Sequence, residues 1–188
     1  MKIIDTSFNW NGTLKKRNST SYVILHHRAG DGDVKSIHNC HVDNGWNGIG
    51  YHFYVRKDGN VYRGRPIASV GAHCTGYNDK SIGVCFEGNF EVETMTKKQL
   101  QAGKALVAYL LKLYPSAELK RHRDFGGTLC PGQRFEFDKI KEGKTEMTID
   151  EAVEIIQAKA GLEEGTIEFL LCYKYGEELV VKLAEAMV

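Results

Sequence analysis

The segment Tyr22-Val-Ile-Leu-His-His27 decides the fold class of this chain. Its apolar start predicts a buried strand that ends on two histidines. A second run, Ser81-Ile-Gly-Val-Cys-Phe-Glu87, is apolar almost throughout, which predicts a strand at the centre of a sheet. Buried strands separated by helical patterns are typical of an α/β protein, so we expect a central sheet with helices on its faces.

Shorter signals add helices and further strands to this core. A helix is predicted over residues 33–46, where Asp33 can cap the N-terminus. A longer helix begins after Thr96, whose spacing to Gln99 predicts a capping box, and Pro115 ends it. Three short strands complete the predicted sheet, and an Asp-Gly turn joins the first two as a hairpin: 51–56, 60–63 and 118–121.

The character of the sequence changes near Gly143. Residues 1–143 carry 21 basic and 14 acidic side chains, a net charge of +7, whereas residues 144–188 carry 4 basic and 10 acidic ones, a net charge of −6. A capping box at Thr148 and Glu151 opens a new helix, and two more helical patterns follow. We therefore predict a larger domain over 1–143 and a small three-helix domain over 144–188. The positive charge of the first suits either an anionic partner or an ordinary solvated surface.

Composition excludes several classes of protein. With 42% hydrophobic and 26% charged residues, the chain has the composition of an ordinary globular protein. No apolar run approaches the roughly 20 residues of a membrane-spanning helix, and no Lys/Arg-rich run indicates nucleic-acid binding. Five cysteines without paired spacing indicate free thiols rather than a disulfide scaffold. The start, Met1 to Trp10, lacks the pattern of a signal peptide, so we expect synthesis in the cytoplasm.

A histidine and a cysteine stand out as candidate metal ligands. His122 and Cys130 are separated by a loop that contains two glycines. Neutral imidazole and thiolate are favoured zinc ligands, and catalytic zinc sites use three protein ligands and leave the fourth position to water. The pair alone also occurs by chance, and a histidine that ends a strand, such as His26, is more often structural than a ligand. Whether these three residues form a metal site therefore depends on the surrounding sequence.

That surrounding sequence resembles the type 2 N-acetylmuramoyl-L-alanine amidases, a family that includes phage endolysins and peptidoglycan recognition proteins. The resemblance covers roughly residues 20–140 and implies the α/β fold of that family, a central mixed β-sheet flanked by helices. Here a small C-terminal three-helix appendage follows it. Four segments carry the resemblance in the family's order: Ile24-Leu-His-His-Arg-Ala29, Gly48-Ile-Gly-Tyr-His-Phe53, Val70-Gly-Ala-His-Cys-Thr-Gly-Tyr-Asn78 with Ser81-Ile-Gly-Val84, and Arg121-His122 with Cys130-Pro131-Gly132.

The resemblance implies a zinc centre and one catalytic side chain. Carried over position by position, it places zinc ligands at His26, His122 and Cys130. Two imidazoles and one thiolate leave a position open for water, which suits the hydrolysis of an amide. Tyr51 matches the family's catalytic tyrosine, and it would donate a hydrogen bond to the oxyanion that forms during the reaction.

Three further residues take roles from the resemblance. Thr128 falls where some phage members carry a lysine and the catalytic recognition proteins carry a threonine. A threonine hydroxyl is a poor acid, so we expect Thr128 to orient substrate or water, and the group that protonates the leaving amine stays open. His73 matches a histidine that lines the family's substrate groove, and we expect Asn78 to share that role.

The remaining histidines and cysteines of interest are predicted to have structural roles. His27 should point to the opposite face of the strand from His26. We expect Trp46 to pack at the end of the first helix rather than to form a platform for a sugar. His38 and His41, on the first predicted helix, are assigned to packing or to the surface. The other side chains assigned to packing are His52, Cys74, Cys85 and Cys172.

We predict zinc-dependent hydrolysis of the amide between N-acetylmuramic acid and L-alanine in bacterial peptidoglycan, the reaction of a phage or prophage endolysin. Such a protein acts on the cell wall after release or export by another route. Two alternatives are a non-catalytic peptidoglycan-binding module and a zinc amidase that acts on another acylated peptide. The three zinc ligands together with Tyr51 favour an enzyme over the binding module. The C-terminal helices would target the wall or assemble a homo-oligomer.

Overall fold

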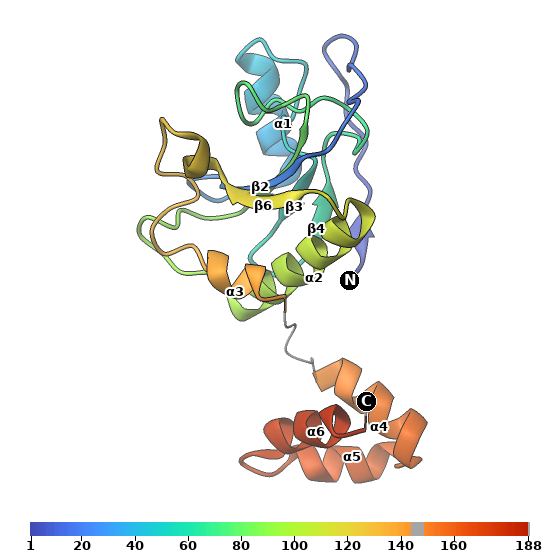
Figure 1. Cartoon of the computed structure of the whole chain (residues 1–188). Coiled ribbons are helices and arrows are strands. Elements are labelled where there is room, and N and C mark those ends of the chain that lie inside the picture. Colours follow the sequence, from blue (N-terminus) through green and yellow to red (C-terminus); the bar gives the residue numbers. More distant parts are fainter. Residues whose placement is uncertain (144–148, 188) are drawn as a thin grey trace. The chain divides into compact units, whose positions relative to one another are not determined.

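The computed structural model describes residues 1–143 and 149–187. The chain divides into two compact units, Met1–Lys144 and Thr145–Val188 (Figure 1). The first unit carries the sheet, and the second is helical. Each unit has a hydrophobic core of its own.

The first unit is built on one mixed sheet of six strands, in the order β1-β4-β3-β5-β2-β6. Strands β3 and β4 form the predicted antiparallel hairpin, and the other neighbouring pairs are parallel. The expected α/β class with a central mixed sheet is confirmed. Strand β1 was not predicted, because two residues are too few to show a pattern. The strands are β1 Ile3–Ile4, β2 Tyr22–His27, β3 Phe53–Val55, β4 Val61–Arg63, β5 Ser81–Phe86 and β6 Glu118–Arg121.

The centre of the sheet positions the histidines. Strand β5 lies between β3 and β2, as its apolar sequence predicted, and all six of its residues are buried. His26, near the end of β2, pairs with Cys85 of β5. Strand β6 runs parallel to β2 on its other side. The carboxyl ends of β2 and β6 therefore meet at the same edge of the sheet, where His26 and His122 lie.

Helices cover both faces of this sheet (Figure 1). Helix α1 packs on one face against side chains of β3 and β5, and α2 and α3 close the larger core on the other face. Asp33 caps α1 as predicted, because its carboxylate accepts the N–H of Ser36 at 2.7 Å. The helices of the first unit are α1 Val34–Asp43, α2 Lys97–Leu113, the 3₁₀ turn η1 His122–Phe125 and α3 Phe137–Lys141.

The capping box predicted at the start of α2 is only half formed. The Thr96 hydroxyl accepts the N–H of Gln99 at 3.1 Å, so the N-cap itself is confirmed. The side chain of Gln99, however, does not return to Thr96. It is fully buried, and its amide donates to the carbonyls of Val55 at 3.2 Å and Glu87 at 2.8 Å. Satisfying two buried carbonyls at the ends of β3 and β5 outweighs the local cap.

The second unit contains the three predicted helices, around a core of Ala152, Ile156, Ile167, Val180 and Ala184. The Thr148 cap lies outside the described residues. Cys172 was predicted to be a core residue, and this was wrong: it is exposed, directly after α5 ends at Leu171. Within the described residues, no helix of either unit has the length and apolar character needed to cross a membrane. The helices are α4 Ile149–Ala160, α5 Glu164–Leu171 and α6 Gly176–Glu185.

Candidate active site

Two strand ends and one loop bring three potential metal ligands together. His26 is the penultimate residue of β2, His122 is the first residue after β6, and Cys130 lies in the loop that follows η1. One ligand atom from each lies within 4.8 Å of the others. The centroids of the two imidazole rings are 4.5 Å apart, and the Cys130 Sγ is 3.9 Å from the His26 Nδ1. Two nitrogens and one sulfur at this spacing form a donor set that fits zinc.

Burial keeps both imidazoles of this cluster neutral. His26 is only 1% exposed, and burial, followed by the neighbouring His122 and His27, lowers its pKa well below the usual range. Burial also lowers the pKa of His122. Neutral imidazole is the form that binds a metal ion, so the two histidines need no deprotonation before they act as ligands.

The thiol of Cys130 is held towards the histidines by the backbone. Its sulfur accepts the N–H of His27 at 3.4 Å. Burial raises the pKa of Cys130 to about 11, although the His27 N–H and the charge of Arg123 lower it in part. A divalent cation at this point would reverse the preference, because a thiol that coordinates a metal ion is deprotonated.

Tyr51 stands beside the three potential ligands with its hydroxyl protonated. Its ring centroid is 5.2 Å from that of His26. Burial, reinforced by the sulfurs of Cys85 and Cys130, raises the pKa of Tyr51 well above its usual range. The phenol therefore remains a hydrogen-bond donor at neutral and alkaline pH, as an oxyanion partner must.

Thr128 contributes to the loop that carries the cysteine. Its hydroxyl oxygen accepts the N–H of Cys130 at 3.1 Å. The hydroxyl keeps its own proton, which it can donate to a group in the site. This geometry suits a residue that orients its neighbours.

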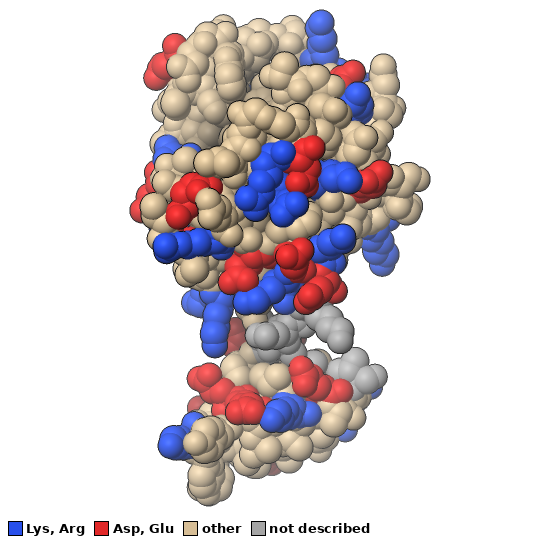
Figure 2. Space-filling model, turned by 60° about the vertical axis from the view of Figure 1, so that its left-hand side comes forward, with Lys and Arg blue, Asp and Glu red and all other residues tan. Residues whose placement is uncertain are grey.

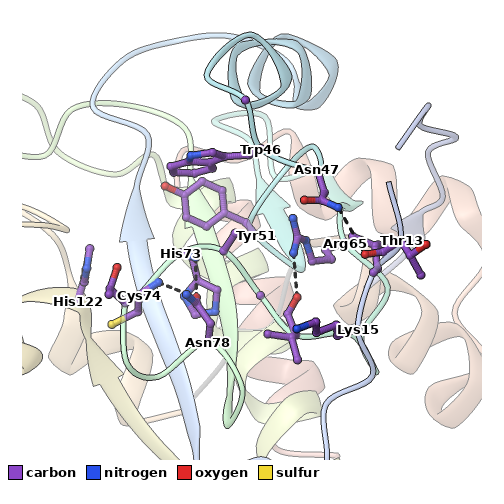
Figure 3. Close-up of a pocket in the computed structure, with 16 residues that line it drawn as sticks. Thr13, Lys15, Trp46, Asn47, Tyr51, Arg65, His73, Cys74, Asn78 and His122 are labelled. Carbon is purple, nitrogen blue, oxygen red and sulfur yellow. Dashed lines mark hydrogen bonds between the residues drawn. The ribbon is translucent and has the colours of Figure 1, made fainter. Parts of the chain in front are cut away.

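A pocket of about 820 Å³ extends from this cluster across the protein surface. Figure 3 shows His122 at one end, Thr13 and Lys15 towards the other, and Tyr51 and His73 between them. Of the described residues, no aspartate or glutamate lines this pocket. Its two lining cations are Lys15, which is exposed, and Arg65, which is buried and donates to backbone carbonyls. The pocket is therefore suited to a neutral or anionic ligand.

The structure places both predicted groove residues, His73 and Asn78, at this pocket. The amide oxygen of Asn78 accepts the N–H groups of His73 at 2.7 Å and Cys74 at 2.9 Å, and thereby closes the loop between them (Figure 3). The amide oxygen of Asn78 thus holds the pocket wall in shape by accepting two backbone N–H groups.

Trp46 packs at the end of the first helix, as expected, and also lines the pocket. It contacts His41 of α1, with ring centroids 4.6 Å apart, in agreement with packing at the end of the helix. It is nevertheless 44% exposed and lines the pocket. The Trp46 ring therefore packs against His41 and also presents exposed surface to a ligand in the pocket.

The other predicted structural histidines are satisfied within the protein. The ring of His52 accepts the N–H of Gly83 at 3.0 Å, and that of His41 accepts the N–H of Gly50 at 3.0 Å. His27 accepts the N–H of Phe90, and His38 accepts the N–H of Ile49. Sequence reasoning missed the pocket residues Thr13 and Lys15, because the segment before β2 shows no motif.

Comparison with known proteins identifies the family of this chain. The family model described as N-acetylmuramoyl-L-alanine amidase matches residues 16–133, well over half of the chain. The chain belongs to this amidase family. The predicted resemblance is confirmed, and with it an amidase that acts on peptidoglycan.

Both branches named by the resemblance appear among the relatives of this amidase. It is 39% identical over 125 residues to peptidoglycan-recognition protein SC2 of Drosophila simulans, and this match covers 60% of this chain and 68% of that protein. It is 35% identical over 126 residues to the endolysin of Escherichia phage T7, over 62% of this chain and 83% of that one. The solved structure of the amidase LysC from Clostridium intestinale has a TM-score of 0.73 and 40% identity, and covers 76% of this chain and 96% of that one.

Proposed function

We propose that the protein is a zinc-dependent enzyme that hydrolyses the amide between N-acetylmuramic acid and L-alanine in bacterial peptidoglycan. The observation that carries this proposal is the cluster of His26, His122 and Cys130, whose ligand atoms lie within 4.8 Å of one another at the end of the pocket. The membership of the amidase family gives the reaction class. The donor set supports zinc as the metal ion.

The residues of the site divide the chemical work. A zinc ion, when bound, would polarise the scissile carbonyl and lower the pKa of water at its open position. Tyr51 would donate a hydrogen bond to the carbonyl oxygen as it gains negative charge, because burial keeps its hydroxyl protonated. Thr128 would orient the reacting groups with its remaining hydroxyl proton.

The pocket supports a stem peptide as the part of the substrate that is recognised. A stem peptide carries carboxylates, and the pocket wall combines the exposed cation of Lys15 with no acidic side chain among the described residues. The exposed face of Trp46 adds apolar surface at the rim. We assign Lys15 to a substrate carboxylate, at the end of the pocket away from His122.

We further propose the biological role of a phage or prophage endolysin, which reaches the cell wall after release or export by another route. The similarity to phage endolysins over most of their length supports this role. A non-catalytic binding module is a weaker alternative, because such a module has no use for a cluster of three metal ligands. A zinc amidase for another acylated peptide would share this site, and only the product distinguishes the two.

The second unit is proposed to be a separable domain that targets or assembles the enzyme. It has its own core, and it exposes the aromatic side chains of Phe169, Tyr173 and Tyr175. Figure 2 shows both acidic and basic side chains on the surface of this unit, and acidic ones outnumber basic ones in its sequence, 10 to 4 over residues 144–188. A net negative surface does not attract an anionic wall, so we favour assembly as a homo-oligomer over wall binding by charge.

The proposed reaction is tested by the bonds that are cut. Purified bacterial cell walls are digested with the full-length protein, and the new termini are identified by mass spectrometry, with Cys130→Ser as the control. We expect free L-alanine amino termini and intact lactyl groups in the wild-type digest alone. New termini within the stem peptide or the glycan strand, or equal activity of the Cys130→Ser protein, would contradict the proposal.

A further inference from the structure

His73 makes two contacts inside the protein that a role in lining the substrate groove does not explain. Its Nδ1 lies 3.0 Å from the Nε2 of His26, on the side of that ring away from Cys130. Its Nε2 lies 3.4 Å from the hydroxyl oxygen of Ser81. His73 is 8% exposed, and Ser81 is fully buried. Both ring nitrogens of His73 are therefore engaged inside the protein.

The direction of each hydrogen bond follows from the serine. The Ser81 hydroxyl donates its single proton to the carbonyl oxygen of Tyr77 at 2.6 Å, so it can only accept from His73. A neutral His73 that donates from Nε2 has its lone pair on Nδ1. His26 must then donate from Nε2, which leaves the lone pair of its Nδ1 facing the Cys130 sulfur, on the side of the potential metal ligands.

The surrounding backbone leaves room for this ring and little else. A Cβ added at Gly83 would lie 2.5 Å from the Cγ of His73, and one added at Gly71 would lie 2.5 Å from its Cδ2. The imidazole is thus confined between two positions that tolerate no side chain, in the orientation that the two hydrogen bonds require.

We propose that His73, anchored by Ser81, is a positioning residue that sets the tautomer and the orientation of His26 as a metal ligand. This inference rests on the proposed function, since it assigns His26 to the metal site. This role takes the place of the expected polar contact between His73 and the substrate, because both ring nitrogens of His73 already have partners inside the protein. Partners of this kind raise the affinity of a ligating histidine for its metal, and their loss typically weakens binding by about 10–100-fold.

The tautomer is measured first, on the metal-free full-length protein. Long-range ¹H–¹⁵N NMR spectra of the histidine side chains report which nitrogen carries the proton. We expect His26 to be protonated at Nε2 in the wild type and to lose this preference in His73→Phe. A wild-type His26 that is protonated at Nδ1 would overturn the inference without touching the proposed reaction.

Zinc affinity is measured next, by competition with a chelator. We expect the dissociation constant to rise about 10–100-fold in His73→Phe and by less than about tenfold in Ser81→Ala, in line with the longer 3.4 Å contact. His73→Asn should retain most of the affinity, because its amide oxygen can accept from His26 as Nδ1 does. Thr75→Val, another change at the pocket, is the matched control and should leave the dissociation constant unchanged.

Two results separate the possible failures. Unchanged zinc affinity in both His73→Phe and Ser81→Ala, with a raised KM for soluble muropeptides in the former, would overturn the positioning role in favour of substrate contact. Failure of the wild type to bind zinc would contradict the proposed function instead, while the tautomer measurement still decides the inference. Melting temperatures of the metal-free variants show whether the fold is retained, and Ser81→Ala serves if His73→Phe does not fold.

Discussion

Replacing Tyr51 with phenylalanine separates transition-state stabilisation from metal binding. The change removes one hydroxyl and keeps the ring, whose centroid lies 5.2 Å from that of His26 and 5.7 Å from that of His41. The packing around the metal ligands is therefore preserved. The change removes the hydroxyl's hydrogen bond with the Cys85 side chain and the proposed donor to the developing oxyanion. One such oxyanion donor is typically worth about 10²–10³ in turnover, or roughly 2.7–4 kcal/mol.

The expected result is an enzyme that holds zinc and binds substrate but turns over slowly. Zinc is counted by elemental analysis, and kcat and KM are measured on soluble muropeptides by chromatography of the released peptide. We expect about one zinc per chain, a KM close to that of the wild type, and a kcat lower by about 10²–10³ in Tyr51→Phe.

Tyr54→Phe provides the matched control, three residues further along the chain. The hydroxyl of Tyr54 donates to the carbonyl of Gly32 at 2.7 Å on the α1 side of the sheet, and Tyr54 is not among the residues that line the pocket. Loss of this hydroxyl removes a partly buried hydrogen bond and should lower the stability by about 0.5–1.5 kcal/mol while turnover stays near the wild-type value. Near-wild-type turnover in Tyr51→Phe with full zinc content would refute the assignment of the oxyanion donor.

Four further changes test the rest of the site. Cys130→Ser should lose most of its zinc by elemental analysis, and a variant with full zinc and activity would remove the cysteine from the ligand set. Thr128→Val should reduce kcat much less than Tyr51→Phe does, whereas an equal loss would show that the hydroxyl takes part in proton transfer. Lys15→Gln should raise the KM for muropeptides with free carboxylates by about 2–5-fold, the effect of an exposed ion pair, while Lys16→Gln, outside the pocket, leaves it unchanged; equal effects would exclude a specific contact. Truncation after Gly143 should keep zinc content and turnover on soluble muropeptides but change the mass measured by light scattering or the binding to intact walls; unfolding would show that the domain boundary is wrong.

Local rules of sequence were sufficient for most of the secondary structure. The N-caps of Asp33 and Thr96 form because each side-chain oxygen meets a backbone N–H three residues ahead, a distance that local sequence determines. The capping box of Gln99 failed for the opposite reason. Its amide serves carbonyls of Val55 and Glu87, which are far away along the chain, and no local pattern reports them.

The three potential metal ligands could be named from the sequence only with the help of the family resemblance. The parallel pairing of β2 with β6 brings His26 and His122 together, although 96 positions separate them. The spacing of residues along the chain does not predict that β2 pairs with β6. The hydrogen bond between His26 and His73 is hidden in the same way, since it depends on how the segment after β4 folds back under β2 and β5.

The misplacement of Cys172 shows the limit of hydrophobic pattern reading in short helices. The run Thr166–Cys172 is apolar at most positions, so the pattern alone extends a buried helix through the cysteine. The helix α5 ends at Leu171, and the cysteine becomes its C-cap with its side chain exposed. Phe169, inside the same helix, is 63% exposed as well, so an apolar run does not by itself show which of its residues face the core.

The metal ligands and the pocket wall come from different parts of the fold, and this separation has a functional consequence. The potential ligands lie at the ends of β2 and β6 and in one loop that the backbone of β2 holds in place. The wall is built largely from the segment before β2, from the segment after α1 and from the loop that Asn78 closes. Substitutions at Lys15 or Trp46 can therefore alter which peptide is bound without moving the metal ligands. His73 is the point where the two regions meet, because its ring lines the pocket and contacts His26 from below. A change there should alter both properties at once, and this coupling explains why its role is best resolved by measuring zinc affinity and KM on the same variant.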